Sequence, residues 1–74
     1  MTYPAVIEEV LPSDFLVCFP EFPEALTGAA TRAEALVQAQ DALETALRYY
    51  RREGLPLPAA RGAGPGETPI SVRL

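Results

Sequence analysis

The sequence has 74 residues and a mass of 8.0 kDa, which is enough for one domain, residues 1–74, and too little for two. Hydrophobic residues make up 49%, charged residues make up 22% and the formal net charge is −4, a composition that excludes a wholly disordered chain. A lone cysteine and the absence of histidine exclude an intrachain disulfide and a zinc site of the Cys/His type, so we expect no metal and no cofactor, with oligomerisation supporting a thin core.

The first nineteen residues are typical of a β-hairpin. Residues 3–10 and 15–19 are rich in β-branched and aromatic side chains, which favour strands. Between them, Pro12-Ser13-Asp14 has the chemistry of a turn. We therefore expect two antiparallel strands with a short polar connection.

The second of these strands has two apolar faces. Alternate residues from Phe15 to Phe19 point to one side, while Leu16 and Cys18 point to the other. Because one helix can cover only one face of a sheet, the other face needs a different cover. We expect Leu16 and Cys18 to lie at an interface between copies of this chain, in a dimer or a tetramer; the alternative is that residues 59–68 fold over them.

A loop and a short third strand follow. Pro20 and Pro23 cannot donate hydrogen bonds to a sheet, so we expect a loop that presents Phe22 at the surface as a rigid anchor. The alternative is that Phe22 forms a lid over the core beside the start of the helix. Residues 25–28 are predicted to form the third strand.

The clearest signal in the sequence is a helix over residues 33–53. Thr31 and Glu34 have the spacing of a capping box at its start. No proline or glycine interrupts the segment before Gly54, a typical residue after a helix C-terminus. The spacing of the larger apolar side chains predicts one buried stripe, made of Leu36, Leu43, Leu47 and Tyr50 and flanked by the small residues Ala39 and Ala46.

The end of the sequence predicts a loop and a last strand. Residues 59–68 are rich in glycine and alanine and indicate a flexible loop within the domain, whereas residues 69–74 alternate apolar and polar side chains. The resulting order, β-β-β-α-β, belongs to the α+β class. We expect a three-stranded antiparallel meander, a helix that crosses one face, and a final strand parallel to the first, because parallel pairing requires a long crossover.

Charge is divided unevenly along the chain. Residues 1–30 carry five acids and no base, whereas residues 31–74 carry six arginines and five acids. An acidic surface of this kind repels nucleic acid and attracts a basic protein, unless it serves only to keep the protein soluble. We expect the partner to be contacted by Glu21, Phe22 and Glu24, with Glu8, Glu9 and Asp14 steering the encounter.

Catalysis finds little support in the sequence. There is no histidine or lysine to act as a base, and Cys18 lies between two apolar residues, as a buried structural cysteine does. The glycine-rich residues 62–66 follow a helix and contain a proline, which indicates a linker and not a phosphate-binding loop. Apolar runs are too short to span a bilayer, and the N-terminus resembles no signal peptide, so we expect a cytoplasmic protein that is not an enzyme.

Four blocks of the sequence resemble the HicB-type antitoxin family. Residues 3–7 resemble the start of such proteins, and residues 17–23 resemble their V-x-F-P-D-L-P-G stretch. Residues 26–36 resemble the x-T-x-G-x-T-x-x-E-A passage, and residues 53–58 match the helix exit E-G-x-P-x-P. Many members carry a C-terminal helix-turn-helix or ribbon-helix-helix domain, which this sequence does not contain, so we expect no direct DNA binding.

The resemblance implies a fold and a function. The fold would be a partial RNase H-like domain, and the function would be to bind and mask a HicA-type toxin, a small basic ribonuclease that cleaves mRNA. Nuclease activity is not expected, because an RNase H site needs several carboxylates and residues 5–7 are apolar. The interpretation is a non-catalytic antitoxin module; the alternative is a stand-alone oligomeric regulatory domain that binds a small ligand between subunits.

Overall fold

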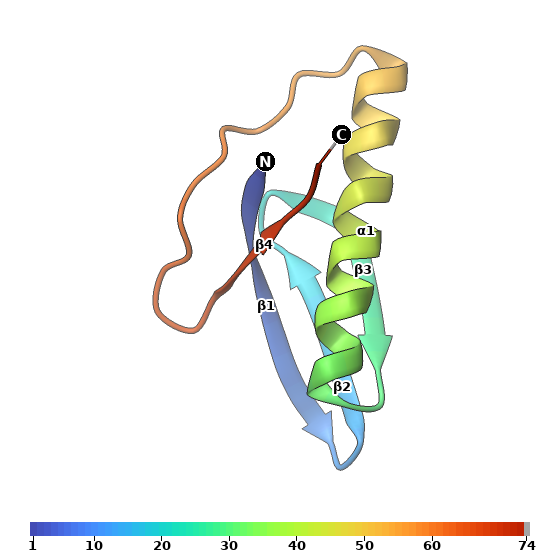
Figure 1. The fold of residues 1–74 in the computed structure, drawn as a ribbon, viewed down its shortest axis with the longest axis vertical. Helices are drawn as coiled ribbons and strands as arrows, with labels where there is room; N and C mark the ends of the chain where they lie inside the picture. Colours follow the sequence, from blue (N-terminus) through green and yellow to red (C-terminus); the bar gives the residue numbers. More distant parts are fainter. Residues whose placement is uncertain (74) are drawn as a thin grey trace.

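The computed structural model describes residues 1–73 and contains one antiparallel sheet with a long helix on one face (Figure 1). The strands lie in the order β3-β2-β1-β4, so β3 and β4 are the edges. The α+β class and the order β-β-β-α-β are confirmed. The elements are β1 (Thr2–Leu11), β2 (Asp14–Phe19), β3 (Phe22–Ala29), α1 (Arg32–Glu53) and β4 (Thr68–Ser71).

β1 and β2 form the expected hairpin. Leu11 pairs with Asp14, which leaves Pro12 and Ser13 as a two-residue turn. Ser13 has a φ of 60°, and two-residue hairpin turns favour this left-handed conformation. The pairing register shifts between Glu9 and Leu11, so β1 contains an irregularity just before the turn.

The third strand is longer than predicted. It begins at Phe22, which pairs directly with Phe19, so only Pro20 and Glu21 form the connection. Pro23 lies inside the strand, which is possible because β3 is an edge and needs partners on one side only. The predicted two-proline loop is therefore wrong.

The orientation of the last strand was also predicted wrongly, because β4 pairs with β1 antiparallel and not parallel. α1 ends near the end of the sheet where β1 begins (Figure 1). If β4 had started there, directly after the helix, it would have run parallel to β1. Instead, residues 54–67 carry the chain back along the sheet. An extended segment of about 14 residues spans roughly 45 Å, which exceeds the 39 Å long axis of the molecule, so this segment is long enough to return to the far end of the sheet. Leu74, part of the predicted strand, lies outside the described residues.

The caps of α1 largely follow the prediction. The Thr31 side chain accepts a hydrogen bond from the Glu34 N–H at 3.1 Å. In return, Glu34 Oε1 accepts one at 3.3 Å from the Ala30 N–H, and not from the Thr31 N–H as expected for a capping box. Gly54 has a φ of 67°, and its N–H donates to the Arg51 carbonyl. Because Leu55 also donates to the Tyr50 carbonyl, the helix ends in a Schellman-like cap.

The buried face of α1 is built from smaller side chains than predicted. Leu43 and Leu47 are fully buried as expected, but Leu36 is 39% exposed and does not belong to the stripe. Its predicted place is taken by alanine, which lets the helix approach the sheet closely. The buried helix residues are Ala35, Ala39, Leu43, Ala46 and Leu47.

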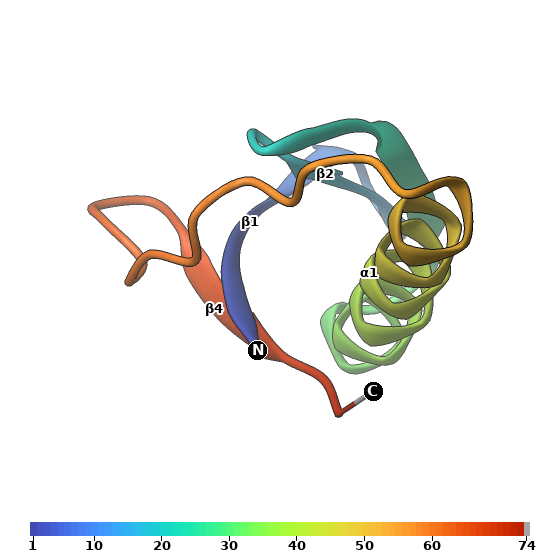
Figure 2. The same ribbon diagram turned by 90° about the horizontal axis from the view of Figure 1, so that it is seen from above.

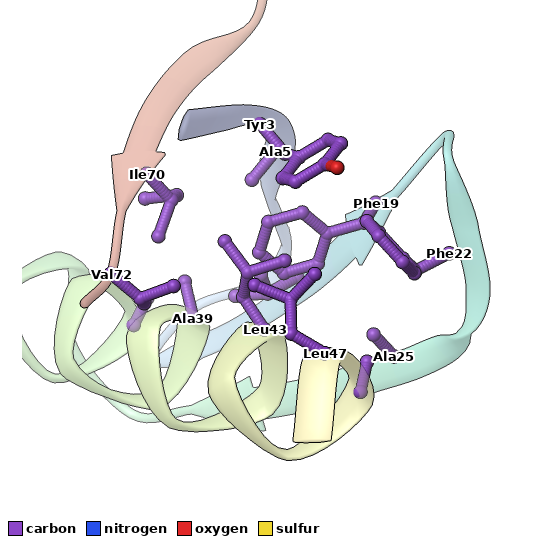
Figure 3. Packing of buried hydrophobic residues seen from close by; sticks show 13 residues of the cluster. Tyr3, Ala5, Phe19, Phe22, Ala25, Ala39, Leu43, Leu47, Ile70 and Val72 are labelled. Atoms are coloured by element: carbon purple, nitrogen blue, oxygen red, sulfur yellow. The ribbon is translucent and has the colours of Figure 1, made fainter. Parts of the chain in front are cut away.

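A single core lies between α1 and the concave side of the sheet (Figures 2 and 3). Leu43 and Leu47 of the helix point toward Phe19 of β2 (Figure 3). Tyr3 and Ala5 of β1 also belong to the sheet side of this core, and both are fully buried. The core therefore includes buried side chains from all the strands, with Phe22 and Ala25 from β3 and Ile70 from β4.

Candidate functional site

The sheet separates the predicted partner-binding residues into two groups. Glu8, Glu9 and Asp14 are exposed and lie near the tip of the β1–β2 hairpin, at one end of the sheet. The connection between β2 and β3 lies at the opposite end (Figure 1) and carries Glu21, with Glu24 close by in β3. These acids therefore do not form one compact site.

Phe22 is not an exposed anchor, because its side chain is 0% exposed. Its ring packs edge-on against Tyr3, at 4.8 Å between centroids, and against Tyr50, at 5.2 Å. Such edge-to-face pairs are a favourable aromatic arrangement. Phe22 is thus a core residue, as the alternative prediction held, although it packs beside the end of α1 and not its start.

Glu21 is half-buried and belongs to an ion-pair cluster centred on Arg61. Arg61 Nε donates to Glu21 Oε2 at 3.0 Å, and both terminal guanidinium nitrogens donate to the Glu67 carboxylate, at 2.8 and 2.9 Å. This bidentate pair, with the Gly64 N–H, lowers the pKa of Glu67 to about 2. The cluster ties residues 61–67, predicted to be a flexible loop, to the β2–β3 connection.

Tyr3 provides a second tie between the linker and the core. Its hydroxyl donates to the Pro58 carbonyl oxygen at 2.6 Å. Burial raises the pKa of Tyr3 above its usual value, and Glu21 adds to the effect. Sequence reasoning missed both ties, because a lone arginine and a tyrosine give no local signal about which distant groups they meet.

Leu16 and Cys18 lie on the face of the sheet that α1 does not cover. Their strand partners are Glu8 and Val6 of β1, which point to the same side. Leu16 remains 38% exposed and Cys18 is half-buried. Because Leu16 stays exposed, residues 59–68, the predicted alternative cover, do not bury it.

A groove runs between the edge of β3 and α1, with a cavity volume of about 560 Å³. Ala42 and Ala46 face it from the helix, and Leu26 borders it from the strand with 60% of its surface exposed. Two carboxylates, Glu24 and Asp41, are among the lining residues, whereas no arginine is. The groove therefore combines an apolar surface, made by small helix residues, with negative charge from its two carboxylates.

Glu24 also contacts the aromatic end of the helix. Hydrogen bonding to the Glu24 carboxylate raises the pKa of Tyr50 above its usual value, and partial burial adds to this. Asp41 was not predicted as a site residue. The signal that was available is the spacing of Gln38, Asp41, Thr45 and Tyr49, which places them on one helix face beside the buried stripe.

The described residues offer little catalytic chemistry. Within residues 1–73, no three Asp, Glu, Cys or His side chains are grouped so that they could hold a metal ion. Cys18 is half-buried in the middle of a strand. No helix in this part of the chain is long and apolar enough to cross a membrane.

Comparison with known proteins gives consistent matches along the whole chain. Residues 2–74 match the family described as "HicB_like antitoxin of bacterial toxin-antitoxin system". The chain is 45% identical over 74 residues to "Antitoxin HicB 1" of Photorhabdus laumondii subsp. laumondii, covering 97% of this chain and 48% of that protein. It is 47% identical over 75 residues to "Antitoxin HicB 2" of the same organism (97% and 52%) and 37% identical over 76 residues to "Antitoxin HicB" of Escherichia coli K12 (97% and 55%). The chain thus spans about half the length of the relatives it matches.

Proposed function

The chain belongs to the HicB-like antitoxin family of bacterial toxin-antitoxin systems, and from that membership we propose that it binds and neutralises a HicA-type toxin, a small basic ribonuclease. The chain would act by occupying the toxin and not by chemistry of its own. The mRNA-cleaving step would belong to the toxin alone.

The distribution of charge carries this proposal. All acids of residues 1–30 except Glu21 are exposed, and no base lies among these residues. The one acid that is half-buried, Glu21, is already paired with Arg61. The remaining four carboxylates keep their full attraction for a basic protein, which raises the rate of encounter more than it raises the lifetime of the complex.

We further propose that the uncovered sheet face is where copies of the chain meet, with Leu16 and Cys18 at its centre. Leu16 is flanked by Gly28 on β3, and Cys18 by Val6 on β1, so this part of the face carries no charge. Glu8 lies on the same face beside Leu16. The assembly would be a dimer or a tetramer in the cytoplasm.

Association rates with the toxin test the proposed function. A catalytically inert HicA-type toxin would be fixed to a surface. Rates would be measured at ionic strengths of about 0.01 M and 0.15 M, where the Debye length falls from about 30 Å to 8 Å.

The charge variants form a matched set. The double variant Glu8→Gln/Glu9→Gln should slow association at low salt by roughly threefold to tenfold, with a smaller effect at high salt. The double variant Glu44→Gln/Glu53→Gln removes the same charge from the arginine-rich helix and should change the rate less. No binding of the unmodified chain to the toxin would refute the function, and equal rates for both variants would refute the steering.

A further inference from the structure

The groove between β3 and α1 has the dimensions of a site for a short stretch of extended chain. Its helix wall runs from Gln38 to Tyr49, about 17 Å at 1.5 Å per residue. At about 3.3 Å per residue, an extended segment of five residues has that length. The cavity volume of about 560 Å³ is large enough for several side chains.

The strand wall of the groove offers unused backbone hydrogen bonds. β3 (Phe22–Ala29) is an edge strand and, among the described residues 1–73, pairs only with β2. Its outer N–H and C=O groups therefore have no strand partner, and such an edge accepts an added strand from another protein. Pro23 cannot donate, so pairing would use the strand from Glu24 onward.

The negative charge of the groove favours a segment that carries positive charge. Glu24 and Asp41 are both exposed, and no arginine lines the groove. The nearby Arg52 guanidinium lies 5.5 Å from the centroid of the Tyr49 ring and pairs with Glu53. A segment that carries lysine or arginine beside an apolar residue would pair its charge with these carboxylates and pack its apolar side chain near Leu26 and Ala42.

A second copy of this chain fits the groove poorly. Each copy has a net charge of −4, and pairing two β3 edges would bring the carboxylates Glu24 and Asp41 of both copies to one interface, where they repel. A basic protein meets no such repulsion.

We propose that this groove is where the basic toxin inserts an extended, lysine- or arginine-bearing segment along the edge of β3. The inference rests on the proposed function and adds the place and the mode of contact. The steering acids at the hairpin tip and the groove would then have separate roles, the first in encounter and the second in holding the complex.

Two matched substitutions on α1 test the inference. Thr45→Arg puts a long cation into the groove, whereas Val37→Arg makes the same change at a β-branched residue that is 63% exposed and does not line the groove. The dissociation constant for the inert HicA-type toxin would be measured for both, after circular dichroism and thermal melting show that both are folded. We expect Thr45→Arg to weaken binding roughly 30-fold or more, mainly through faster dissociation, and Val37→Arg to change it less than about threefold.

The possible failures are distinguishable. If the unmodified chain binds the toxin and Thr45→Arg binds it equally well, the groove is not the contact and the proposed function stands. If Thr45→Arg abolishes self-association and leaves toxin binding unchanged, the groove holds a second copy and the inference is wrong. If the toxin does not bind the unmodified chain, the proposed function and this inference both fail.

Discussion

Replacing Phe22 by alanine should nearly unfold this protein. The Phe22 ring is fully buried between Tyr3 and Tyr50, in two edge-to-face contacts with interplanar angles of 83° and 80°. A buried Phe→Ala change costs about 3–5 kcal/mol, and each aromatic pair adds about 0.5–1.5 kcal/mol beyond the area it buries. For 74 residues, the expected free energy of unfolding is only about 4–11 kcal/mol. The loss is therefore a large fraction of the total.

Urea unfolding followed by circular dichroism measures the effect. Phe22→Leu keeps part of the side-chain volume and should cost about 1–2 kcal/mol, which leaves a folded protein with a measurable transition. Leu26→Ala on the same strand is the control and should cost less than about 0.5 kcal/mol, because Leu26 is 60% exposed. If Phe22→Ala loses less than about 1 kcal/mol while toxin binding weakens, the ring is an exposed contact after all and the account of the core is wrong.

Three further predictions concern the helix and the linker. Leu43→Ala should lower the free energy of unfolding by about 2–5 kcal/mol and Leu36→Ala by less than about 1 kcal/mol, because only Leu43 is buried; equal losses in urea titrations would place Leu36 in the core. Thr31→Ala should cost about 1 kcal/mol through the lost cap to Glu34, and a loss as large as that of Leu43→Ala would mean that the helix starts elsewhere. Because Arg61 holds the pKa of Glu67 near 2, their pairing should stabilise the fold fully above pH 4.5 and be lost as the pH falls from 4.5 toward 2. Arg61→Gln should flatten this part of the stability profile, and an unchanged profile would show that the pair contributes nothing.

Local patterns were sufficient to predict most of the elements. The Thr31 and Gly54 caps act within a few residues of themselves, so both ends of α1 were predicted to within one residue. Alternation in β2 correctly assigned Val17 and Phe19 to the buried face and Leu16 to the open one.

The errors share a different physical origin. The direction of β4 depends on how far residues 54–67 travel, and composition does not encode that path. Pro23 breaks a central strand but not an edge, and the sequence does not say which strands are edges. The exposure of Leu36 depends on how α1 is rotated over the sheet, which the small residues Ala35 and Ala39 decide.

The candidate site was predictable in its charge and not in its shape. The acidic bias of residues 1–30 is a property of composition, and it survives in the structure as exposed carboxylates. The groove depends on the packing of α1 against β3, and only that packing brings Glu24 of β3 and Asp41 of α1 to the same hollow.

Inhibition of RNA cleavage tests the central claim most directly. The chain would be titrated into a fixed amount of active HicA-type toxin, and the cleavage rate of an mRNA substrate would be followed. The account predicts that cleavage falls in proportion to added chain until the toxin is saturated, and that Thr45→Arg shifts this titration to higher concentration while Val37→Arg does not. Cleavage that continues at an unchanged rate in a large molar excess of the folded chain would contradict it.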